Sequence, residues 1–72
     1  MTLKLSKNNL CRFCDLCTHL KTQGMHIEVF QDNIVVSGSS FLGLTLIDCD
    51  KPFKIISRND VALDCFNEWR IE

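Results

Sequence analysis

The chain has 72 residues, of which 46% are apolar, and its eight basic and nine acidic side chains leave a formal net charge of −1. This length predicts a single domain over residues 1–72 with a small core, and the apolar fraction excludes a disordered chain. No basic stretch interleaves with aromatic residues, which argues against nucleic-acid binding. No apolar run has the length of a signal peptide or a membrane span, so we expect a cytoplasmic protein without membrane insertion.

The first third of the chain predicts a short strand followed by a long helix. Residues 2–6, TLKLS, alternate polar and apolar side chains, as half-buried strands do. Asn8 or Asn9 can cap a helix whose first turn begins near Leu10. Gly24 is the type of residue that ends a helix. The helix would carry one apolar stripe, formed by Leu10, Phe13, Cys14, Cys17 and Leu20, with Leu16 at its border.

A hairpin and a short helix are predicted in the middle of the chain. Residues 26–30 alternate again, residues 31–33 (QDN) have turn chemistry, and residues 34–36 return as a second strand. Ser40 then precedes an apolar run. Because a serine in this position is a typical N-cap, we expect a short helix within residues 40–48.

The last part of the chain predicts one more strand, residues 53–57, and a final helix, residues 61–69. Strands with one buried face and helices with one apolar stripe favour packing of the helices on one side of the sheet. We therefore expect an α+β fold in which three helices cover one face of a four-stranded antiparallel sheet. The final helix is expected to share a buried face formed by Ala62, Cys65, Phe66 and Trp69.

Three cysteines in the stretch LCRFCDLCTHL stand at intervals of three. A structural zinc or iron–sulfur site needs four converging ligands, and this pattern supplies three along a stiff helix. We therefore expect Cys14, Cys17 and Cys65 to be small core side chains. No metal or other cofactor is predicted.

Cys11 and Arg12 form a separate pair of candidates. Cys11 falls in the first turn of the predicted helix, where the helix dipole favours a thiolate. Arg12 could bind a phosphate or a carboxylate with its planar guanidinium. An incidental surface cysteine and a solvated arginine are the simpler interpretations, and both interpretations stay open at this point.

Residues 35–48, VVSGSSFLGLTLID, resemble a stretch of HPr, the histidine-containing phosphocarrier of the bacterial sugar phosphotransferase system. In that family a strand ends, a regulatory serine opens a short helix, and the pattern Ser-apolar-apolar-Gly follows, which Ser40 to Gly43 fit. Residues 58–66, RNDVALDCF, are similar to the start of the family's last helix. The resemblance implies the βαββαβα open-faced sandwich, which is the order that the periodicity predicts.

The segment that accepts phosphate in the family differs in this chain. In HPr, a histidine between the first strand and the first helix accepts phosphate from enzyme I and passes it to sugar transporters. The corresponding residues 6–13, SKNNLCRF, contain no histidine. If Arg12 matches the family's arginine, Leu10 stands at the histidine position and Cys11 follows it. We therefore expect a regulatory or protein-binding module without histidine phosphotransfer, rather than an enzyme.

The resemblance also implies a modification site and a docking surface. Ser40 would be phosphorylated by an HPr kinase, which is compatible with an N-cap role. The partner would be a component of the phosphotransferase system or such a kinase. The family's docking surface combines the start of the first helix with the short middle helix, and its counterparts here are Leu10, Phe13, Phe41, Leu42 and Leu46. Burial of some of these residues in the core is the alternative, and it stays open residue by residue. Two alternatives stay open: a working phosphocarrier with Cys11 as acceptor, and a cysteine-based redox or metal-binding protein.

Overall fold

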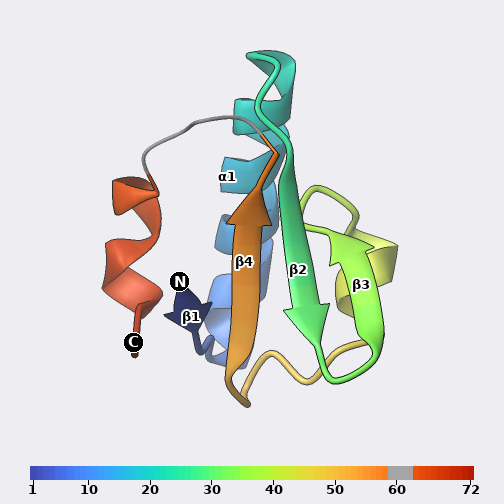
Figure 1. Cartoon of the computed structure of the whole chain (residues 1–72), viewed down its shortest axis with the longest axis vertical. Helices are drawn as coiled ribbons and strands as arrows, with labels where there is room; N and C mark the ends of the chain where they lie inside the picture. Colours follow the sequence, from blue (N-terminus) through green and yellow to red (C-terminus); the bar gives the residue numbers. More distant parts are fainter. Residues whose placement is uncertain (59–62) are drawn as a thin grey trace.

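A computed structural model describes residues 1–58 and 63–72 and shows an α+β fold (Figure 1). The four strands form one antiparallel sheet in the order β1-β4-β2-β3. Side chains from α1, α2 and the final helix η2 join the inward residues of the sheet in one core, so the predicted open-faced sandwich is confirmed. The elements, in chain order, are β1 (Thr2–Leu3), η1 (Lys7–Asn9), α1 (Leu10–Thr22), β2 (Ile27–Gln31), β3 (Ile34–Ser37), α2 (Phe41–Leu44), β4 (Phe53–Ser57) and η2 (Asp64–Trp69).

The long helix α1 begins at the predicted residue but without the predicted asparagine cap. The 3-10 turn η1 leads directly into it, and the Asn9 side chain makes no capping hydrogen bond. That side chain instead donates to Ser6 Oγ at 3.1 Å. The helix ends as predicted, because Gly24 takes a positive φ of 82° and its N–H donates to the Lys21 carbonyl.

The hairpin between β2 and β3 turns through two residues rather than three. Gln31 pairs with Ile34, so it belongs to the strand, and Asp32 alone takes a left-handed φ of 52°. Aspartate tolerates this conformation better than most residues. Because side chains alternate along β2, Gln31 lies on the same face as the buried Ile27 and Val29, beside the loop that precedes β4.

Strand β1 is shorter than the predicted strand over residues 2–6. Thr2 and Leu3 pair with β4, but the next N–H groups leave the sheet. The Lys4 N–H donates to the Trp69 carbonyl at 3.1 Å, and the Leu5 N–H donates to the Cys49 carbonyl at 2.7 Å. The segment therefore joins the sheet to η2 and to the loop before β4.

The final helix differs from the predicted α-helix over residues 61–69. Residues 59–62, and with them the prediction for Ala62, lie outside the described residues. Asp64–Trp69 form a 3-10 helix, whose period of three aligns Phe66 with Trp69 on the buried side. Cys65 precedes Phe66 by one residue and points away from the buried side of this tighter helix. It is exposed, so its prediction as a core residue is wrong.

An aromatic cluster around Phe13 forms the centre of the core. The Phe13 ring lies 5.8 Å from Phe53, 5.4 Å from Phe66 and 5.9 Å from Trp69, measured between centroids. These spacings are those of favourable edge and tilted ring pairs. Through them α1 packs against β4 and η2. Among the described residues, no helix has both the length and the apolar character needed to span a bilayer.

Two leucines of α2 provide a matched test of this packing. Leu44 is 0% exposed and Leu42 is 80% exposed, although they lie two residues apart. Leu44→Ala should lower the free energy of unfolding by about 2–5 kcal/mol, because it removes buried contacts and leaves a cavity. Leu42→Ala should change it by about 0.5 kcal/mol or less. Urea unfolding measures both, and equal losses would contradict this placement of α2.

Candidate functional site

The short helix α2 owes its start to Ser40. Ser40 has an extended backbone, and its Oγ accepts a hydrogen bond from the Gly43 N–H at 3.0 Å. A Cβ at position 43 would lie 3.1 Å from Ser40 Oγ and 3.2 Å from Val36 Cβ, so glycine lets the helix approach β3 closely. The N-cap prediction is confirmed. The helix spans four residues, fewer than the predicted range 40–48 allows, and the chain continues from Thr45 in turns.

Large apolar side chains on α2 and on the turn after it are exposed to solvent. Phe41 is 48% exposed, Leu42 is 80% exposed and Leu46 is 66% exposed. Leu44 and Ile47 are buried on the opposite side. We call Phe41, Leu42 and Leu46 the α2 patch. Three of the five predicted docking residues are therefore exposed, on α2 and in the turn that follows it.

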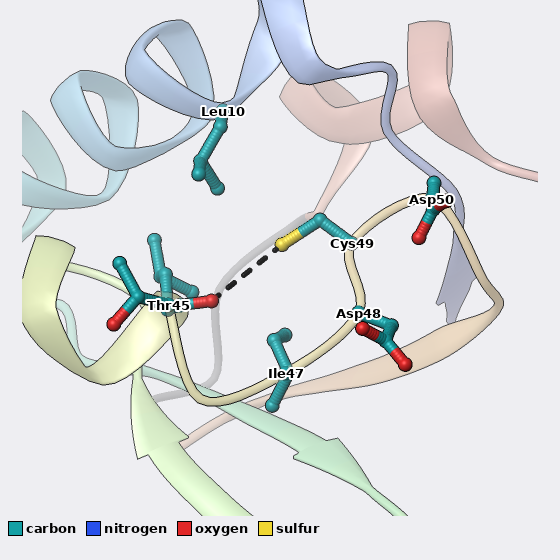
Figure 2. Close-up of a pocket in the computed structure, with 7 residues that line it drawn as sticks. Leu10, Thr45, Ile47, Asp48, Cys49 and Asp50 are labelled. Atoms are coloured by element: carbon teal, nitrogen blue, oxygen red, sulfur yellow. Dashed lines mark hydrogen bonds between the residues drawn. The ribbon is translucent and has the colours of Figure 1, made fainter.

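A pocket of about 450 Å³ lies beside α2 (Figure 2). We call it the α2 pocket. Leu10, the first residue of α1, lines this pocket together with residues of α2. The pocket therefore lies between the two elements that form the docking surface in the HPr resemblance. Its lining residues are Leu10, Leu44, Thr45, Ile47, Asp48, Cys49 and Asp50.

The side-chain amide of Gln31 holds the loop wall of this pocket in place. Its Nε2 donates to the Asp48 carbonyl at 2.8 Å and to the Pro52 carbonyl at 3.3 Å. Its Oε1 accepts from the Asp48 N–H at 2.7 Å. The amide thus substitutes for a neighbouring strand and satisfies backbone groups of a loop. Sequence reasoning missed this role because it assigned Gln31 to the turn; a two-residue turn would have indicated a strand position.

Cys49 is a second residue of the site that sequence reasoning missed. Its half-buried thiol donates a weak hydrogen bond to the Leu44 carbonyl at 3.9 Å (Figure 2). Burial raises the pKa of Cys49, and the nearby Asp50 and Asp48 carboxylates raise it further. The thiol therefore lines the pocket as a neutral group. Its position in a turn between two aspartates carried no distinct signal in the sequence.

The two predicted docking residues on α1, Leu10 and Phe13, differ in burial. Leu10 is partly buried and lines the α2 pocket. Phe13 is completely buried at the centre of the aromatic cluster, so its prediction as a docking residue is wrong. Both residues belong to the same stripe of α1, but Leu10 lies one turn earlier, at the start of the helix and at the edge of the core.

Arg12 is engaged within the chain. Its guanidinium donates to Glu68 Oε1 at 2.8 Å and to Asn9 Oδ1 at 3.3 Å, and it lies 5.6 Å from the centroid of the Trp69 ring. These contacts join the start of α1 to η2. Because both charged side chains are largely exposed, the ion pair contributes little to stability. Anion binding by Arg12 stays a prediction, and it would require the guanidinium to exchange Glu68 for the anion.

All five cysteines are free thiols, but their surroundings differ. Cys14 and Cys17 are buried as predicted, whereas Cys11 is exposed in the first turn of α1. Burial, with smaller contributions from Cys14 and Cys65, raises the pKa of Cys17 to about 12. The reactivity of Cys11 stays a prediction. Within residues 1–58 and 63–72, no three His, Cys, Asp or Glu side chains are arranged to hold a metal ion.

The raised pKa of Cys17 predicts a loss of stability at alkaline pH. An ordinary thiol titrates at 9.0, so the unfolded chain releases this proton before the folded chain does. The stability from the neutral thiol is complete below pH 9 and is lost as the pH rises toward 12. Cys17→Ala should therefore lose less free energy of unfolding between about pH 8 and pH 10.5 than the parent, by on the order of 1–2 kcal/mol. Urea unfolding under reducing conditions measures the difference.

Val29→Ala is the control for this alkaline titration. It removes part of another completely buried side chain but no ionisable group. It should lower the stability by the same amount at every pH. Parallel curves for the parent and Cys17→Ala would contradict the raised pKa of Cys17.

Comparison with known proteins assigns no relative to the chain. No family model, curated protein or solved structure with which it was compared matches it.

Proposed function

We propose that this chain is a cytoplasmic HPr-like module that binds a protein partner through the α2 patch and the α2 pocket, without passing phosphate through a histidine. The observation that carries the proposal is the joint exposure of Phe41, Leu42 and Leu46 on one short segment. The proposed partner is a component of the sugar phosphotransferase system or an HPr kinase.

The energetics of the α2 patch support a binding role. Burying a Leu or Phe side chain stabilises a fold or a complex by roughly 1.5–3 kcal/mol. In the isolated chain these three side chains are largely exposed, so most of this stabilisation is available only on binding a partner. Leu46 lies in the turn that directly follows α2, so it belongs to the same short segment as Leu42. Grouped apolar side chains of this kind are typical of a partner site.

The position of the pocket also supports this proposal. The HPr resemblance implies a docking surface built from the start of the first helix and the short middle helix. Leu10 from α1 and Leu44 from α2 line the same pocket, beside the α2 patch. The segment over residues 6–13 has no histidine, and Leu10 occupies the matched position with a partly buried apolar side chain. An apolar side chain there can contact a partner but cannot accept phosphate.

Phosphorylation of Ser40 is the regulatory property that the HPr resemblance implies, and it can be tested. Its Oγ caps α2 and is partly buried, so a phosphate there would have to replace the hydrogen bond to the Gly43 N–H. The added charge of nearly −2 would lie directly beside Phe41, the first residue of the α2 patch. Modification of Ser40 would therefore change the surface that we propose as the docking site.

The absence of histidine phosphotransfer is tested by the intact mass of the purified chain. After incubation with enzyme I and phosphoenolpyruvate, we expect no added phosphoryl group, because no imidazole lies in the segment before α1. A gain of one group would contradict the proposal, and its loss in Cys11→Ser would identify a cysteine phosphocarrier. A parallel incubation with an HPr kinase and ATP, with Ser40→Ala as control, determines whether the serine switch is present.

The docking role is tested by affinity capture with two aspartate variants as bait. Leu42→Asp places a charge in the α2 patch and should reduce recovery of the partner by on the order of tenfold or more. Ile56→Asp is the control, because Ile56 is 51% exposed but lies on the open face of the sheet. It should leave recovery unchanged. An equal reduction by both variants, or by neither, would contradict docking at the α2 patch.

A further inference from the structure

The α2 pocket combines an apolar interior with an acidic rim. Leu10 and Ile47 supply apolar side chains, whereas the side chain of the third apolar lining residue, Leu44, is completely buried. Figure 2 shows Asp48 and Asp50 on the loop wall, on either side of Cys49, while Leu10 projects toward the pocket from the opposite side. A ligand of this pocket would therefore meet hydrocarbon at its centre and carboxylates at one margin.

The two carboxylates are available to a partner. Asp48 lies 3.7 Å from the Lys51 ammonium, but both side chains are mostly exposed, so this ion pair is weak. Asp50 forms no ion pair with any side chain that the structure describes. It also borders a second hollow that includes Lys4 and Arg70, and neither of these is paired with it. Both carboxylates act on the pocket, because they raise the pKa of the Cys49 thiol that lines it.

We propose that the partner inserts an aliphatic side chain into the α2 pocket and places a lysine or arginine beside it, against Asp48 and Asp50. This proposal rests on the docking function above and adds the chemistry of the partner. An apolar side chain matches the interior, and a flanking cation matches the rim. A segment with a flanking carboxylate would meet like charges at the same margin and be rejected.

The loop geometry supports a preformed pocket rather than one that the partner must build. Gln31 binds the backbone at Asp48 and Pro52, and the Leu5 N–H binds the Cys49 carbonyl. These contacts hold the backbone from which both aspartates project. A preorganised rim avoids part of the ordering cost of binding, so even a short peptide should show the preference.

Titration of the ¹⁵N-labelled full chain with short peptides tests this inference. The probes are acetylated, amidated pentapeptides: Gly-Lys-Leu-Lys-Gly, its counterpart with both lysines replaced by glutamate, and its counterpart with the leucine replaced by glycine. The lysine–leucine peptide should shift the amide signals of Leu10, Thr45 and Asp50 but not that of Ile56. Its affinity should exceed that of either counterpart by about tenfold.

The double variant Asp48→Asn, Asp50→Asn isolates the charge effect. It keeps the size of both side chains, and neither residue belongs to the core. In this variant the lysine and glutamate peptides should bind with equal affinity. A preference for the lysine peptide that survives in the variant would overturn the assignment of the rim.

The remaining outcomes separate this inference from the docking proposal. Equal affinity of the lysine and glutamate peptides for the parent chain would overturn the charge preference but leave docking at the α2 patch intact. Failure of all three peptides to shift these signals would overturn insertion into the pocket, while the Leu42→Asp capture experiment tests docking independently. Concentration-dependent shifts of the same signals without peptide would identify a second copy of the chain as the occupant and overturn the proposed partner.

Discussion

The contact of Phe13 with Phe53, Phe66 and Trp69 determines how α1 sits on the sheet, and the other parts of the site depend on it. A domain of this size has few side chains with which to fill its core, so one aromatic residue that touches three others has a large share of the packing. With Phe13 directed inward, Cys14 and Cys17 follow it into the core. Leu10 comes to the edge of the core, where the loop after α2 closes a pocket around it.

The second constraint is the shortness of α2. Four helical residues bury Leu44, and they leave Phe41 and Leu42 outside. The cap from Ser40 and the close approach of Gly43 to β3 keep this segment against the sheet, so the exposed side chains have a defined position. Gln31 then fixes the following loop from the opposite side. Polar contacts therefore hold the candidate surface in place, although the exposed side chains themselves are apolar.

Much of the fold could be predicted because periodicity and turn residues act locally. The alternation in β2 and β4, the apolar stripe of α1, Gly24 and Ser40 all indicated their structures from nearby sequence. The failures came where one element competes with another. Cys65 was expected in the core because an α-helical period was assumed, and the 3-10 winding of η2 turned it outward. The Asn9 cap was displaced because η1 enters α1 directly.

The sequence by itself determined the order of elements, the apolar faces of α1 and the sheet, and the absence of a histidine before the first helix, because these depend on residue identity and spacing. Only the tertiary structure decided which apolar residues face a partner. Phe13 and Leu42 are both large and apolar, yet the first is enclosed by rings from β4 and η2 and the second is 80% exposed. The pairing of Gln31 with a loop 17 residues away, and the gathering of Leu10 with Asp48 and Asp50, likewise arise from contacts between distant segments that local patterns do not encode.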